Sequence, residues 1–154
     1  MWFLNNREII KDLAINTGTT DTPVYSTMCC TSEVNFNTEF EVTDFYTFCD
    51  ALQRSVITGV AVSIETTVKL DINNTAVQDL ISKIHTMISS GAIAQFNNQT
   101  IQFKLLSGES AGVLTYTTYT APVTLVFSDL GGGAEEEGEF SLEIKFNGVA
   151  TASV

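Results

Sequence analysis

Residues 73–91 constrain the fold most, because they form the one long helical pattern in a chain that otherwise alternates like β-strands. Thr75 and Gln78 have the spacing of a capping box, and Gly91 lies where a left-handed residue would end the helix. An apolar stripe this wide needs a partner surface, and only β-sheets before and after it are available. The stripe consists of residues three or four positions apart, namely Val77, Leu80, Ile81, Ile84 and Ile88.

Polar and apolar residues alternate in most other segments, as in half-buried strands. In the clearest case, one face would carry Val34, Phe36, Phe40 and Val42, and the other Asn35, Asn37, Glu39 and Glu41. The last segment would point Phe140, Leu142, Ile144 and Phe146 inward and Glu139, Ser141, Glu143 and Lys145 outward. Further strands are predicted at residues 24–29, 60–70, 100–106, 113–119 and 123–130.

Three segments fit this rhythm less well. Residues 7–18 suit either a short helix or a strand, and we favour the strand. Residues 44–52 break the alternation and are interpreted as a packed connecting segment, while Pro122 interrupts a β-rich run because proline cannot donate a ladder hydrogen bond. The prediction is an α+β, mainly β fold: an antiparallel β-sandwich or barrel of about seven or eight strands with one flanking helix at about residues 75–90.

The composition suits one domain over residues 1–154, since 44% of the residues are hydrophobic and ten are phenylalanine. No apolar run approaches the roughly 20 residues of a membrane helix, and residues 1–6 are too short and uncharged for a secretory signal, so we expect no membrane partner. Seven basic residues face eighteen acids, for a net charge of −11, which disfavours conventional nucleic-acid binding. The interpretation that the acidity serves only solubility has equal weight.

No motif predicts an enzyme, a cofactor or a metal site. Cys29 and Cys30 would point to opposite faces of a strand, so at most one reaches Cys49, and free buried thiols in a reducing compartment are the preferred interpretation. His85 has no second ligand at metal spacing. Two patterns favour a solvated acidic hairpin tip over a phosphate or calcium loop: Gly131–Gly133, and Glu135–Glu137 with Asp129. No serine is predicted to act as a nucleophile, which applies to Ser107, Ser110 and Ser128.

The strand surfaces favour association between sheet edges. Residues 115–120 form a Thr/Tyr-rich ribbon, and only Lys69, Lys104 and Lys145 supply lysine charges within the strand runs. Because lysines commonly protect exposed edges from pairing, their scarcity predicts that edges are completed by neighbouring copies.

At this point the order of elements resembles the major tail tube proteins of tailed bacteriophages and the related tubes of type VI secretion systems. The resemblance covers residues 24–148 and depends on a succession of segments: 31–34, 44–50, 59–65, the helix ending at Gly91, 100–103, 121–125, the acidic turn, and 140–148. It implies a structural virion protein without enzymatic activity. Six copies would close a ring by joining sheet edges, and stacked rings would form a hollow tail tube that conducts DNA during ejection.

The resemblance also implies partners and sites. The partners would be other copies of the chain, the tape measure and tail terminator proteins, and DNA passing without specific binding, in a virion tail assembled in the bacterial cytoplasm. An acidic lumen would repel phosphates, and residues 1–23 would lie at the ring–ring interface. Candidate lumen residues are Asn35, Asn37, Glu39, Glu41, Ser63, Glu65 and Thr67; a rival assignment puts Glu139 and Glu143 inside instead. Candidate inter-subunit loops contain Thr19, Asp21, Gly112, Tyr116, Gly132 and Glu136.

Two other functions stay open. One is the tube of a contractile injection or secretion system, which would export protein instead of DNA. The other is a secreted β-sandwich that binds carbohydrate, for which Tyr116 and Tyr119, taken to share a strand face, are the only candidates for an aromatic platform.

Overall fold

The computed structural model describes residues 3–28, 31–47, 50–131 and 133–153. Cys29, Cys30, Cys49 and Gly132 lie outside the described residues, so the predictions about the thiols and about Gly132 stay predictions.

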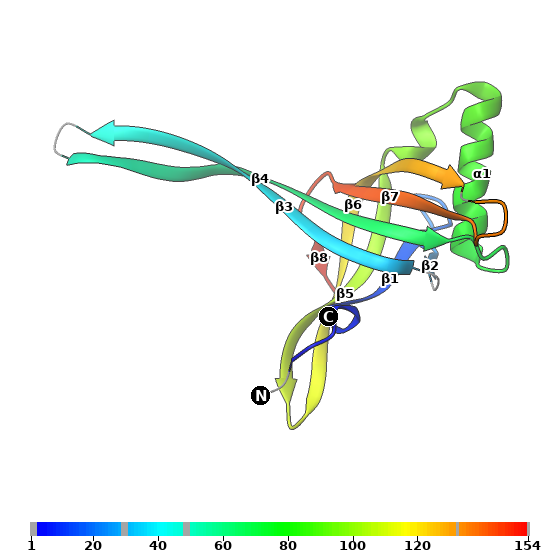
Figure 1. Cartoon of the computed structure of the whole chain (residues 1–154), viewed down its shortest axis with the longest axis horizontal. Helices are drawn as coiled ribbons and strands as arrows, with labels where there is room; N and C mark the ends of the chain where they lie inside the picture. The colour runs from blue at the N-terminus through cyan, green and yellow to red at the C-terminus, as the bar shows by residue number, and fades with distance from the viewer. Residues whose placement is uncertain (1–2, 29–30, 48–49, 132, 154) are drawn as a thin grey trace.

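One antiparallel sheet contains all eight strands of the described residues, in the order β2-β1-β5-β6-β7-β4-β3, with the short β8 added to β6 (Figure 1). This confirms the mainly β class, while the path ends at β2 and β3, so the described strands do not close into a barrel. The elements are η1 (Asn6–Glu8), β1 (Ile10–Asn16), β2 (Tyr25–Thr27), β3 (Thr31–Thr47), β4 (Asp50–Lys69), α1 (Thr75–Ser90), η2 (Ala94–Phe96), β5 (Gln99–Ser110), β6 (Val113–Gly131), β7 (Glu139–Phe146) and β8 (Thr151–Ala152).

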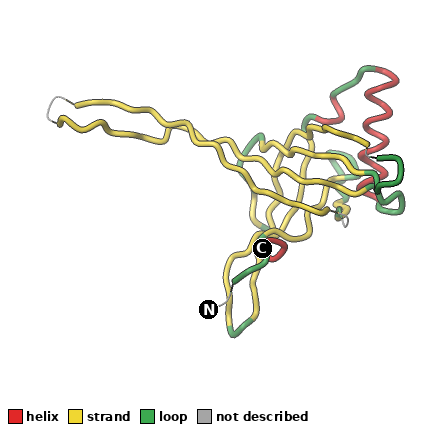
Figure 2. Tube along the Cα trace, in the orientation of Figure 1, coloured by secondary structure: helices red, strands yellow, loops and turns green. Residues whose placement is uncertain are grey.

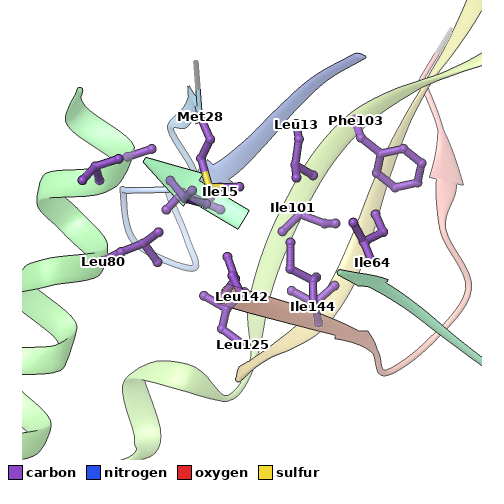
Figure 3. Close-up of a cluster of buried hydrophobic side chains, with 14 of the residues drawn as sticks. Leu13, Ile15, Met28, Ile64, Leu80, Ile101, Phe103, Leu125, Leu142 and Ile144 are labelled. Atoms are coloured by element: carbon purple, nitrogen blue, oxygen red, sulfur yellow. The ribbon is translucent and has the colours of Figure 1, made fainter. Parts of the chain in front are cut away.

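The core lies on the inner side of the curved sheet, where its strands turn toward one another and toward α1 (Figure 3). β7 supplies its side chains as the alternation predicted, with Phe140, Leu142 and Ile144 buried. β1 confirms the strand favoured for the N-terminal region. The other large contributors come from β1, β4, β5, β6 and α1: Leu13, Ile15, Ile64, Val68, Ile101, Phe103, Val123, Leu125, Val77 and Leu80.

α1 has the predicted span, but two details of the prediction are wrong. The N-cap is Asn74, whose side chain accepts a hydrogen bond from the Val77 amide at 3.2 Å; the proposed box on Thr75 is one residue late. Ile88 is 74% exposed, because the last turn of the helix extends past the sheet, whereas Leu80 and Ile84 are buried. The C-terminal prediction is confirmed, since Gly91 has a φ of 70°.

β6 is a single strand and not two, so the predicted interruption at Pro122 is wrong. Pro122 pairs with Thr100 of β5, and its carbonyl accepts a hydrogen bond from the Asn147 amide on the opposite side. The N–H and C=O of one strand residue point to the same side. The side on which Pro122 lacks an N–H is therefore the side of the gap between the end of β7 and β8. No ladder bond is lost there.

β3 and β4 continue far beyond the body of the molecule as a two-stranded hairpin, on the left of Figures 1 and 2. β7 pairs with β4 only from Ser63 to Lys69, so the part of β4 before Ser63 has β3 as its only described partner strand. The prediction of a packed connector at residues 44–52 is therefore wrong: residues 44–47 and 52 are exposed, and residues 44–47 belong to β3. We call residues 36–47 and 50–62 the arm.

Candidate functional site

One side of the sheet is polar across four neighbouring strands, on the face opposite the core. In one cross-strand row Asn35 of β3 faces Glu65 of β4, which in turn faces Glu143 of β7. In the next row Thr67 lies between Glu33 and Ser141. We call this surface the polar face, and it carries Glu33, Asn35, Asn37, Ser63, Glu65, Thr67, Ser128, Ser141, Glu143 and Lys145. Part of it is hollowed into a shallow depression of about 290 Å³.

The two assignments that looked like rivals describe the same surface. The candidate lumen residues Ser63, Glu65 and Thr67 pair directly with Lys145, Glu143 and Ser141, so Glu143 joins the early-strand residues. Glu39 and Glu41 continue this face onto the arm, opposite Ala61 and Gly59. Glu33 and Ser128 were not predicted from the sequence. The alternation of their strands is visible there, but which residues lie beside them on the sheet depends on strand register.

Most side chains of the polar face are uncharged, and among its charged side chains glutamates outnumber lysines. Its two lysines each contact a carboxylate: Lys69, at its edge, lies 3.2 Å from Glu139 and 3.6 Å from Glu137, and Lys145 lies 4.0 Å from Glu143. The hydrogen bond and the charge of Glu139 raise the pKa of Lys69 above its ordinary value. Glu65 and Glu143 face one another as like charges, an arrangement that weakens a sheet slightly and therefore contributes nothing to its stability.

The arm exposes apolar side chains that a folded monomer normally buries. Phe40 and Val60 form a cross-strand pair with exposed fractions of 54% and 56%, and Val42 and Ile57 form another with 52% and 61%. A contiguous apolar surface of this kind marks a site of association. It was missed from the sequence because alternation shows which residues share a face and not whether anything covers it.

The two ends of the strand path are β3 and the three-residue β2, so β3 is the longer free margin of the sheet. Lys69, Lys104 and Lys145 lie in β4, β5 and β7, and the prediction that these are the only strand lysines is wrong, since Lys11 lies in β1. Each of these four strands has neighbours on both sides. β3 contains no lysine along its 17 residues. The longest open edge therefore lacks the charge that most often prevents strand addition.

The predicted inter-subunit residues lie at separate places. Thr19 and Asp21 are exposed in the β1–β2 loop, and Gly112 is exposed in the β5–β6 turn with a φ of 81°. Glu136 is exposed in the β6–β7 connection. Tyr116 is not in a loop: it lies within β6, half-buried, and its hydroxyl donates to the Glu8 carbonyl at 2.7 Å.

The aromatic platform considered for carbohydrate binding does not form. Tyr116 and Tyr119 pair with Leu106 and Phe103 along a regular stretch of β6, so they point to opposite faces. Tyr119 stacks on Phe103 with ring centroids 5.8 Å apart, and the Lys11 ammonium lies 4.6 Å from the Tyr116 ring centroid. The prediction that the two tyrosines share a face is wrong.

Groups that could support chemistry are scarce among the described residues. No group of three His, Cys, Asp or Glu side chains there is placed to hold a metal, and His85 is exposed on α1. None of the helices described is long and apolar enough to cross a membrane.

The fold is that of chains found in phage-like tails and injection systems, as the resemblance in the sequence predicted. A chain from the tail of an empty GTA particle, refined as a helix with C6 symmetry, superposes with a TM-score of 0.61 at 10% identity, covering 99% of this chain and 100% of that one. A chain from the virion of a native gene transfer agent gives a TM-score of 0.57 at 12% identity, again over 99% and 100%.

An extracellular contractile injection system, the PVC sheath–tube complex in its extended state, contains a chain with a TM-score of 0.53 at 8% identity, covering 95% of this chain and 90% of that one. No protein-family model and no curated protein sequence matches the chain. Similarity at these identities defines the fold alone.

Proposed function

We propose that the chain is the repeating subunit of a hollow tail tube, in which six copies close a ring and rings stack. The observation that carries this proposal is the match, over nearly the whole of both chains, to a subunit of a tail with C6 symmetry. The free β3 edge supports it, because a heterologous contact between different edges can close by rotation into a ring, and a contact along the axis then repeats as a filament.

The polar face supplies the wall of the bore in this proposal. Its glutamates outnumber its unpaired cations, because Lys69 and Lys145 already contact carboxylates. Such a wall repels passing phosphates. It also offers no free cation to neutralise them and displace their counterions, so DNA slides without binding. The apolar core and α1 then lie on the outer side, away from the cargo.

Assembly is tested by electron microscopy of the purified protein at high concentration. Stacked annuli or tubes are the expected result, and isolated particles at every concentration would refute the proposal. The bore is tested by Glu39→Lys and Glu41→Lys, which should slow DNA ejection from assembled particles while tubes still form. Glu135→Lys, the same charge change in the exposed β6–β7 connection, is the matched control and should leave ejection unchanged.

A second candidate, the tube of a contractile injection system, is favoured by the match to the PVC complex and by one to the baseplate of the anti-feeding prophage, with a TM-score of 0.56 at 14% identity. Both candidates share the same subunit and the same stacking. They differ in cargo, so recovery of nucleic acid inside particles, or of protein, decides between them.

A further inference from the structure

Asn147 and Gly148 form the only Asn–Gly pair in the sequence, and the fold leaves their backbone outside the strand ladder. β7 ends beside Val123 of β6, and β8 rejoins the same edge of β6 at Thr120. Residues 147–150 therefore lie opposite only two residues of β6, so this stretch has more chain than a regular ladder can pair.

Pro122 is the reason that the stretch stays unpaired. Its carbonyl accepts a hydrogen bond from the Asn147 N–H at 2.9 Å, but it has no N–H to donate in return. Among the described residues, the Gly148 N–H has no hydrogen-bond acceptor, and both Asn147 and Gly148 are exposed to solvent. A wet backbone amide outside the ladder can change its conformation without any opening of the sheet.

The side chain of Asn147 lies on the polar face. Its amide nitrogen donates to the Thr124 hydroxyl at 2.7 Å, and Thr124 pairs with Lys145, which belongs to that face. This bond has to break before the amide can react, and one ordinary hydrogen bond lowers the reactive population by only about fivefold. Asn147 therefore combines a weakly held amide with an unpaired nitrogen on the next residue.

We propose that Asn147–Gly148 is a site of spontaneous deamidation. The Gly148 nitrogen loses its proton to hydroxide and attacks Cγ of Asn147, so that a new N–Cγ bond replaces the Cγ–Nδ2 bond and ammonia leaves after taking a proton from water. Water then opens the cyclic imide at either of its carbonyls, which gives aspartate or isoaspartate. Each event consumes a water molecule and releases an ammonia molecule. Asparagine is chemically labile, and glycine places no Cβ beside the attacking nitrogen.

The products differ from asparagine in charge and in connectivity. Either product adds one negative charge to the formal −11 of the chain, beside Thr124 and Lys145 on the polar face. Isoaspartate also adds a carbon atom to the main chain between β7 and β8, and β8 is the strand that holds the end of the chain on β6. The site is a property of the single chain. Only one effect, a bore wall that becomes more acidic as particles age, rests on the proposed tube.

The test incubates the purified full chain at neutral and mildly alkaline pH and follows each asparagine by peptide mass spectrometry, with isoaspartate detected by enzymatic methylation. Asn147 should convert at least about tenfold faster than Asn35 and Asn37, which are exposed on the same face but do not precede glycine, because a side chain on the next residue crowds the attacking nitrogen. Its rate should rise in proportion to the hydroxide concentration.

Two variants serve as matched controls, and both should lose the fast conversion. Gly148→Ala adds only a Cβ, which would lie 3.1 Å from Pro122 Cγ and needs a small local shift. Asn147→Gln keeps Gly148 and a side-chain amide, but its longer side chain would have to close a larger ring. Fast conversion at position 147 in either variant would overturn the mechanism.

A comparison with the unfolded chain tests the role of the fold. Asn147 should convert in the folded protein within about tenfold of its rate in guanidinium chloride, because residues 147–150 need no unfolding to react. Conversion only in denaturant, or conversion no faster than that of Asn35 and Asn37, would refute the inference. These measurements do not depend on assembly: a chain that never forms tubes refutes the proposed function and still reports on Asn147.

Discussion

Phe40 and Val60 offer the sharpest quantitative test of the arm, because they form an exposed cross-strand pair on its apolar face. Replacing both with threonine puts β-branched residues, which favour strands, at both positions and removes most of the apolar surface. Just over half of each side chain is exposed, which amounts to about 150 Å² of apolar area available for burial. At about 25 cal/mol per Å², covering that area contributes about 4 kcal/mol, of which the threonine methyl groups retain about 1.

The double variant should therefore weaken each copy–copy contact by about 3 kcal/mol, which raises the concentration needed for assembly roughly a hundredfold. Its free energy of unfolding as a monomer should change by less than about 1 kcal/mol, since neither side chain belongs to the core and only a cross-strand pair is lost. Light scattering with negative-stain microscopy measures assembly, and urea denaturation measures stability. Asn37→Thr, on the other face, is the control.

Assembly of the double variant at the wild-type concentration would show that the apolar face is not a contact. A loss of monomer stability of several kcal/mol would show instead that Phe40 and Val60 act within the subunit. Either result refutes the reasoning.

Three further predictions concern the helix and its ends, each measured by chemical denaturation of the monomer. Leu80→Ala, at a fully buried position, should lower the free energy of unfolding by about 2–5 kcal/mol, whereas Ile88→Ala on the same helix should change it by less than about 0.5. Asn74→Ala should lower the free energy of unfolding by about 1 kcal/mol because the N-cap is lost, and Thr75→Ala should lower it by only a few tenths. The reverse order would favour Thr75 as the capping residue. Gly91→Ala should cost about 1 kcal/mol, because alanine resists a φ of 70°.

Local pattern decided which residues share a face, and those predictions were confirmed for β7, β3 and α1 but not for Tyr116 and Tyr119. The alternation of β7, the two faces of β3 and the span of α1 follow from periods of two and 3.6 residues, which act within a few positions of the chain. The exceptions at Thr75 and Ile88 lie at the ends of the helix, where one residue of shift decides a cap or an exposure.

The sheet order could not be predicted, because strand partners and register depend on residues far apart in the sequence. Glu65 and Glu143 share the polar face only because β7 pairs with β4, so two assignments that seemed exclusive became one surface. The arm likewise exists because that pairing ends at Ser63 while β3 and β4 continue together. Alternation determined the two faces of each strand, and tertiary pairing determined which of those faces merge, which are buried, and which are left for another copy of the chain.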